Sequence, residues 1–147
     1  MKTEGFDALM RRLNNIGGDV EASAEKGMLA AALKASGEAK LLCPVDEGIL
    51  RNSIQAGVEK DKGRTVGFVK TNVYYAPYVE FGTGQRGKGS PSPPKWDGSL
   101  NYREDWAGMP AQPFLFPAIN NNRPQLAKIV MDQVKKDIKK QLLGGGE

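Results

Sequence analysis

Near the end of the chain, apolar side chains recur at every fourth position. They are Leu126, Val130, Val134, Ile138 and Leu142, with Ile129 and Met131 widening the same stripe. This spacing places the side chains along one face of an α-helix. Pro124 suits the first turn of a helix, and the run "GGG" at 144–146 is a stop signal. The sequence therefore predicts a long C-terminal helix whose apolar face packs against the rest of the chain.

A second amphipathic pattern runs from residue 20 to residue 42. Its predicted buried stripe consists of Val20, Ala24, Met28, Ala31, Ala32, Ala35, Ala39 and Leu42. Asp19 suits the N-cap of this helix, and Pro44 disfavours helix at Cys43. Because most of the stripe is small, we expect this helix to pack closely against a sheet or another helix.

A shorter amphipathic helix is predicted over residues 5–16. Its apolar positions are Phe6, Leu9, Met10, Leu13 and Ile16. Gly17 and Gly18 follow directly and end the pattern.

The period changes from helix to strand after the turn-like sequence "PVDEG". Ile54, Ala56 and Val58 alternate with polar residues, and Val66 and Phe68 alternate again. The "DKG" sequence at 61–63 joins the two runs tightly. The pattern predicts an antiparallel hairpin with one buried face. Two strands alone are marginally stable, so we expect the long helix to cover them.

The remaining segments have weaker patterns. "YYAPYVEF" fits either a strand broken by Pro77 or, as we prefer, a single helical turn with Pro77 at its first position and Gly82 just past its end. "QPFLFPAI" is expected to add an edge strand. Residues 83–112 are rich in glycine and proline without a sustained period, which predicts a long flexible loop that has a function or is disordered.

These elements predict one α+β domain over residues 1–147. In it, a small antiparallel sheet packs against a long helix in the N-terminal half and a C-terminal helix. A chain of 147 residues has room for one compact core.

Composition excludes several classes of function. The chain has no histidine and one cysteine, so Cys/His zinc sites and Ser-His or Cys-His nucleophile pairs are impossible. Cys43 is expected to be a small buried thiol. We therefore expect no enzyme activity, cofactor or metal. No apolar run approaches the roughly 18 to 20 residues of a membrane span, and the polar N-terminus does not resemble a secretory signal, so we expect synthesis in the cytoplasm and no membrane partner.

One short stretch imitates a nucleotide-binding loop. "GTGQRGKGS", residues 82–90, satisfies both G-x-x-x-x-G-K and G-x-G-x-x-G. A phosphate loop needs a helix that begins directly after the lysine, and Lys88 is followed by Gly89 and "SPSPPK" instead. We therefore interpret the stretch as a glycine-rich, mildly basic loop. Among the carboxylates, Glu80 is expected to cap or pair locally rather than to act in catalysis.

Three separated stretches resemble one known family. They are "CPVDEGILRNSI" at 43–54, "YYAPYVEFGTG" at 74–84 and "MPAQPFLFPAI" at 109–119. In this order, between the expected helices, they resemble the tail-completion (neck, minor tail or head-tail joining) family of long-tailed, lambda-like bacteriophages. Glu47 stands where that family usually has threonine, and Gln112 stands where it usually has arginine.

The resemblance implies a structural virion protein of the neck or tail, present in the host cytoplasm during assembly. It implies a ring, hexameric in the particle, that contacts the head-completion or connector protein and the tail tube or tail terminator. DNA would pass through this ring without sequence-specific binding.

Under this hypothesis, a group of side chains is expected to contact neighbouring subunits or partners. They are Arg51, Tyr75, Tyr78, Glu80, Phe81, Gly82, Thr83, Arg86, Lys88, Trp96, Tyr102, Trp106 and Phe114. The aromatic ones would anchor the loop, either at a subunit boundary or in the core. Arg51 is expected to pair with Asp46 or Glu80 within the subunit.

An alternative is a small basic nucleic-acid-binding module. The net charge of +4, the aromatic and basic loop, and the lysines of the last helix would serve phosphate contacts and base stacking.

Overall fold

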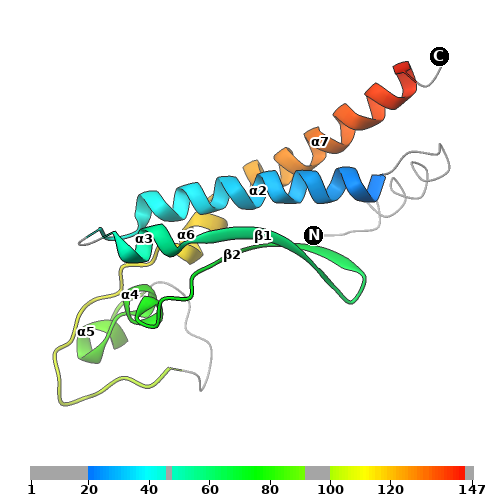
Figure 1. The fold of residues 1–147 in the computed structure, drawn as a ribbon. Coiled ribbons are helices and arrows are strands. Elements are labelled where there is room, and N and C mark those ends of the chain that lie inside the picture. The colour runs from blue at the N-terminus through cyan, green and yellow to red at the C-terminus, as the bar shows by residue number, and fades with distance from the viewer. Residues whose placement is uncertain (1–19, 46–47, 92–99, 145–147) are drawn as a thin grey trace.

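The computed structural model describes residues 20–45, 48–91 and 100–144 (Figure 1). The helix predicted over 5–16 lies outside these residues. Within them, eight elements follow one another: α2 (Val20–Leu42), α3 (Ile49–Ser53), β1 (Gln55–Asp61), β2 (Arg64–Lys70), α4 (Ala76–Phe81), α5 (Gly84–Lys88), α6 (Leu115–Asn120) and α7 (Arg123–Gly144). This arrangement confirms the α+β class.

The two long helices α2 and α7 lie against each other (Figure 1). The sheet was expected to pack against both of them, but the hairpin and α7 both pack mainly against α2. The contact between α2 and α7 is close because small residues of α2 face α7. A Cβ atom on Gly27 would lie 3.0 Å from the Val130 Cα. Further along, Val20 and Ala24 form a buried cluster with Val134, and Ile138 packs against it. The long helices therefore meet backbone to backbone at one point and through side chains beyond it.

The predicted stripe of α2 needs two corrections. Leu42 is 47% exposed, and Met28 is only half buried. The buried positions instead include Ser23, Gly27 and Ser36. Polar and small residues replace larger apolar ones because the neighbouring backbones approach too closely for long side chains.

The Gly27 contact supports a mutational prediction. We expect Gly27→Ala to destabilise the domain by about 1 to 3 kcal/mol, because the added methyl group overpacks against the α7 backbone. Gly37, also in α2, is a matched control, since a methyl group added there would have no neighbouring atom within 4 Å. Gly37→Ala should stabilise by about 0.5 to 1 kcal/mol through helix propensity alone. Urea denaturation of both variants measures the difference, and equal shifts would contradict the packing argument.

A hydrogen-bond cluster also ties α2 to α7. The Ser23 hydroxyl donates to the Asp137 carboxylate at 2.6 Å, and the Gln133 side-chain amide donates to the same oxygen at 3.0 Å. The Ser23 hydrogen bond, followed by the one from Gln133, lowers the pKa of Asp137 below its usual range.

This cluster predicts a pH dependence of stability. Because the folded pKa of Asp137 is depressed, its contribution is fully present above the unfolded pKa of about 3.9 and is lost as pH falls through the folded value. We expect Ser23→Ala to destabilise the protein at pH 7 and to have a smaller effect at the acid end of the folded range. Denaturation of both proteins at several pH values tests this, and a pH-independent difference would refute it.

The hairpin forms as predicted, with β1 and β2 antiparallel and Gly57 opposite Phe68. The predicted buried face is wrong for β2, because Ala56 and Val58 lie opposite Val69 and Gly67. Val66 and Phe68 therefore lie on the other face of the hairpin. Lys62 and Gly63 form its turn with positive φ angles of 51° and 79°. α2 covers one face, since a Cβ atom on Gly67 would lie 3.3 Å from the Met28 side chain. The two-stranded sheet therefore rests on the middle of α2.

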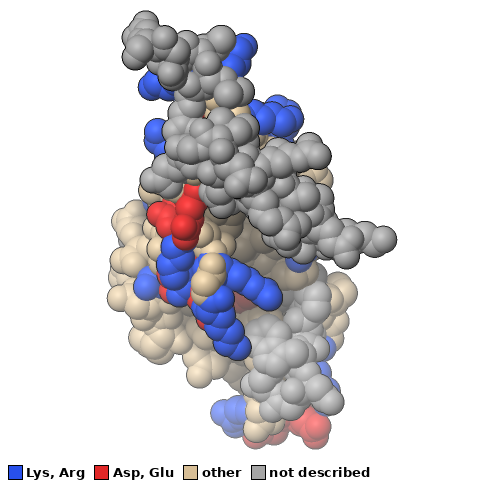
Figure 2. Space-filling view, turned by 90° about the vertical axis from the view of Figure 1, so that its right-hand side faces the viewer, with Lys and Arg blue, Asp and Glu red and all other residues tan. Residues whose placement is uncertain are grey.

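An ion-pair group fixes the hairpin to the start of α2. The Lys60 ammonium lies 2.7 Å from carboxylate oxygens of both Glu21 and Glu25. These hydrogen bonds raise the pKa of Lys60. On the side of the molecule that Figure 2 presents, Lys and Arg side chains gather near the centre of the view beside acidic ones.

A second core lies at the other end of α2, where the short helices gather. It consists of Ala39, Cys43, Leu50, Ile54, Ala76, Phe114 and Ala118. Cys43 is buried, as predicted, and burial raises the pKa of its thiol. α4 has Pro77 in its first turn and ends at Phe81, with Gly82 directly after it, which confirms the preferred interpretation of "YYAPYVEF".

Three segments differ from the sequence-based predictions. "QPFLFPAI" contains helix α6 rather than an edge strand. The predicted loop 83–112 contains helix α5 at Gly84–Lys88, and α3 was not predicted. Helices of five or six residues are too short to show a helical period, so their sequences carry little signal. Within the described residues, no helix is long and apolar enough to cross a membrane.

Candidate functional site

The buried carboxylate of Glu80 joins two segments that are far apart in the sequence. One carboxylate oxygen accepts the backbone N–H of Phe114 at 2.8 Å and of Leu115 at 3.0 Å. The other accepts the N–H of Phe116 at 2.8 Å. These are amides at the start of α6, which have no partner within the helix. A negative charge is also favourable at a helix N-terminus, so Glu80 caps α6 from α4.

The prediction that Glu80 caps or pairs locally is therefore confirmed in part. Glu80 caps a helix, but that helix is more than thirty residues away rather than local. Its hydrogen bonds in the described structure go to backbone amides instead of to Arg51, which lies exposed on α3. Asp46, the other predicted partner of Arg51, is outside the described residues.

The two arms of the predicted loop are hydrogen-bonded to each other. Thr83 and Met109 exchange both backbone hydrogen bonds, at 2.9 and 3.1 Å. The N–H groups of Gln85 and Arg86 donate to the carbonyls of Trp106 and Ala107, each at 2.9 Å. The described parts of the loop thus form a fixed frame that extends from α4 and α5.

Glycines allow the two arms to approach this closely. A Cβ atom on Gly82 would lie 2.6 Å from the Ala111 amide nitrogen, and one on Gly84 would lie 2.5 Å from the Trp106 carbonyl oxygen. One on Gly108 would overlap the Thr83 carbonyl oxygen. Gly82, Gly84 and Gly108 also have positive φ angles, which glycine adopts without strain.

The same geometry explains the imitation of a phosphate-binding loop. The N–H groups of Gln85, Arg86, Gly87 and Gly89 already donate to backbone carbonyls. A phosphate cradle needs such amides unpaired and directed at the ligand. α5 also ends at Lys88 rather than beginning after it. The glycines of "GTGQRGKGS" serve chain packing.

The frame carries an apolar groove of about 280 Å³. Its lining includes Tyr78 and Phe81 from the α4 side and Leu100, Tyr102 and Trp106 from the returning arm. The Tyr102 hydroxyl donates to the Phe81 carbonyl at 2.9 Å, which joins the two walls. Burial raises the pKa of Tyr102.

Large apolar side chains stand exposed around this groove. Tyr78 is 60% exposed, Trp106 49% and Met109 57%. Clusters of exposed aromatic side chains on a fixed backbone are typical of protein–protein contact sites. We call Tyr78, Trp106 and Met109, with the groove between them, the aromatic rim.

Two basic side chains beside the aromatic rim, those of Lys88 and Arg103, are paired with acidic ones. The Lys88 ammonium lies 3.5 Å from Glu104, and the Arg103 guanidinium lies 3.0 Å from Asp105. The Arg103 hydrogen bond lowers the pKa of Asp105. These pairs reduce the net positive charge that the loop presents to a partner.

The predicted interface residues divide into three groups. Tyr78, Phe81, Gly82, Thr83, Tyr102 and Trp106 line the groove together, with Arg86 and Lys88 exposed on the adjacent α5. Glu80 and Phe114 are buried inside the subunit, and Tyr75 packs half buried against the same core. Arg51 lies apart on α3, and Trp96 is outside the described residues.

Sequence reasoning missed two exposed apolar residues next to these groups. Tyr74 is 84% exposed and packs edge-on against Tyr75, with ring centroids 5.4 Å apart. Met109, in the aromatic rim, precedes Pro110 in the third motif. A signal was present for both, since each lies in or beside a motif that resembles the phage family.

No group of three or more potential metal ligands occurs among the residues that the structure describes. The site therefore consists of an apolar groove, an aromatic rim and paired charges, an arrangement suited to contact with another macromolecule.

Residues 7–82 match the model of a protein family described as "Bacteriophage HK97-gp10, putative tail-component". The matched stretch is 76 of the 147 residues, just over half of the chain. The chain belongs to this HK97-gp10-like family of phage tail components. No curated protein and no solved structure matches the chain.

The HK97-gp10-like match confirms the family resemblance and gives the protein a structural role in a phage virion. Tail components of this kind are not a class of enzymes. The match ends at Gly82, the residue directly after α4. The frame, α6 and α7 come later in the chain than the matched residues. Glu80 lies inside the matched residues and binds α6 outside them, so one interaction connects the two parts.

Proposed function

We propose that the protein is a tail-completion or neck subunit that forms a ring between the capsid connector and the tail tube. The family match and the aromatic rim support this proposal. The rim presents apolar side chains from a hydrogen-bonded frame, so it loses little conformational freedom when a partner covers it.

In this proposal, the aromatic rim contacts a neighbouring subunit or an adjoining neck protein. Trp106 and Tyr78 are the anchors, because tryptophan and tyrosine contribute most to such contacts. Glu80 and the loop glycines hold the frame in place rather than touching the partner. DNA would pass through the assembled ring without sequence-specific contacts.

The paired charges favour assembly over the alternative of a nucleic-acid-binding module. Lys88 and Arg103 both lie beside acidic side chains, whereas phosphate binding needs basic groups that release counterions. A DNA-binding module should bind duplex or single-stranded DNA with an affinity that falls steeply with salt.

Native mass spectrometry and electron microscopy of the full chain, alone and with candidate connector and tail-tube proteins, test this function. We expect rings or complexes with those partners, and weak DNA binding. A chain that stays monomeric with every partner, or that binds DNA tightly and salt-dependently, would overturn the proposal.

A matched pair of variants tests the aromatic rim. We expect Trp106→Ser to weaken ring formation or partner binding by about 30-fold, the effect of losing an interface anchor worth about 2 kcal/mol. Leu41→Ser is the control, because Leu41 is 74% exposed at the C-terminal end of α2 and does not line the groove of the rim. Both variants should keep the wild-type unfolding midpoint. Equal effects of the two changes on assembly would exclude the rim as the contact site.

A further inference from the structure

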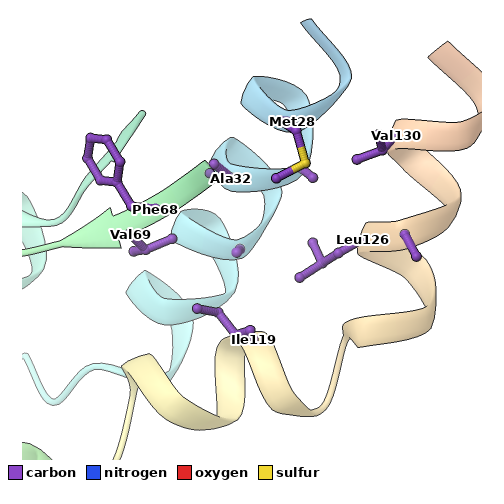
Figure 3. Close-up of a pocket in the computed structure, with 11 residues that line it drawn as sticks. Met28, Ala32, Phe68, Val69, Ile119, Leu126 and Val130 are labelled. Atoms are coloured by element: carbon purple, nitrogen blue, oxygen red, sulfur yellow. The ribbon is translucent and has the colours of Figure 1, made fainter. Parts of the chain in front are cut away.

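A second apolar groove, of about 260 Å³, lies between β2 and α7 (Figure 3). α2 forms its floor with small residues, among them Ala31, Ala32 and Ala35. In Figure 3, Met28 and Val69 extend from one side of this space and Leu126 and Val130 from the other. We call it the α2 groove.

Apolar side chains in the α2 groove are exposed to water, which is unfavourable. Met28, Val69, Leu126 and Val130 are each only half buried, and Ile119 at its end is 39% exposed. No charged side chain lines it. An apolar cavity of about 150 Å³ accommodates one benzene ring, so this groove has room for one or two large apolar side chains.

The first nineteen residues of the chain supply such side chains close by. Phe6, Leu9 and Met10 belong to the amphipathic pattern over 5–16, which joins α2 through Gly17 and Gly18. Two consecutive glycines permit the sharp reversal that would bring this segment back along α2. The segment therefore starts from the end of the helix that forms the groove's floor.

The segment also has the right length. The groove begins at Met28, nine residues beyond Asp19, or about 13 Å along α2 at 1.5 Å per residue. A twelve-residue helix spans about 18 Å, so a segment that reverses at the glycines reaches the level of Met28 with its first turn. Phe6 lies ten residues before Ile16, about 15 Å from the reversal, and would then be level with the start of the groove. Leu9 and Met10 would lie along α2 between the reversal and Met28.

From this we infer that residues 5–16 of the chain form an amphipathic helix that docks in the α2 groove of the same subunit. Phe6, on its apolar face, covers Met28 and Val130 at the start of the groove, and its charged face, with Arg11 and Arg12, lies outward. This inference is independent of the proposed function, because it concerns how each subunit completes its own core.

Hydrogen–deuterium exchange of the full chain tests the inference. A free helix of twelve residues is marginal in water, so protection of its amides requires docking. We expect amides of 5–16 to exchange at least ten times more slowly than unstructured peptide amides, at every protein concentration. Exchange at the unstructured rate would overturn the inference. Protection that disappears on dilution would also overturn it, since it would show the groove filled by a neighbouring copy.

Two variant pairs locate the docking site. Ala127 lines the groove and is exposed, so Ala127→Trp fills the groove; Gln125→Trp changes a nearby exposed position, which does not line it. We expect Ala127→Trp to abolish the protection of 5–16 and Gln125→Trp to keep it. Within the segment, Leu9→Asp should abolish protection and Asn14→Asp should keep it. Leu9→Asp and Asn14→Asp leave α2, the hairpin and α7 unchanged. This pair therefore decides the question even if Ala127→Trp fails to fold. Protection that survives Leu9→Asp would overturn the inference.

Discussion

Glu80→Ala should unfold the region around α6 and destabilise the domain by about 3 kcal/mol or more. The change leaves the N–H groups of Phe114, Leu115 and Phe116 without their acceptor. Each buried polar group left without a partner costs about 1 to 3 kcal/mol, and the half-buried ones recover part of this from water. Since a domain of this size is stable by only about 5 to 15 kcal/mol, the loss is a large fraction of the total. Urea denaturation measures it.

Two controls separate the capping role from the loss of a charge. Glu80→Gln keeps one oxygen acceptor but places an N–H group against the remaining amides, so we expect an intermediate loss. Glu104→Ala removes an exposed carboxylate whose partner Lys88 lies 3.5 Å away, and should change stability by about 0.5 kcal/mol or less. A loss below about 1 kcal/mol for Glu80→Ala would refute the capping role.

The sequence predicted those elements whose patterns are long enough to repeat. α7 repeats its apolar residues over more than four turns, and its observed bounds, Arg123–Gly144, agree with the predicted proline and glycine signals. The positions of α2, the hairpin and α4 along the chain agree as well, although the buried faces of α2 and β2 differ in part from the prediction. Each has either a sustained period or a proline and a glycine at its ends, so local physics alone specifies it.

α6 could not be predicted by the same reasoning. Its sequence "LFPAIN" is a short apolar run, which fits a buried strand as well as a helix. The acceptor for its first amides is Glu80, thirty-four residues before Phe114, and no local pattern contains that information. α6 is a helix because α4 delivers a carboxylate to its start.

The candidate site was predicted in part for a similar reason. Tyr78, Tyr102 and Trp106 were selected as anchors from their residue types, and the structure brings them to one groove. Phe114 was selected in the same way, yet it is fully buried. Residue type selects a candidate aromatic anchor, but only the fold decides whether its ring is exposed or lies in the core.

Gly108→Ala is expected to disrupt the frame that carries the aromatic rim. The new methyl group would overlap the Thr83 carbonyl oxygen, which accepts the Met109 N–H at 3.1 Å. The φ angle of 68° adds a cost of about 1 to 2 kcal/mol for a residue with a Cβ atom. Neither backbone arm can move without breaking the exchange of hydrogen bonds between Thr83 and Met109. We therefore expect rapid hydrogen exchange at these two amides.

Gly89→Ala is the matched control for this change. The nearest atom to its added methyl group is 3.5 Å away, an ordinary contact, and its φ angle of −79° suits alanine. Exchange at Thr83 and Met109 should stay slow in Gly89→Ala while it rises at least tenfold in Gly108→Ala. Because α2, α7 and the hairpin do not contain this glycine, their exchange should change less than that of the frame. If Gly108→Ala left the two amides protected, the close approach of the arms would not be what holds the rim in place.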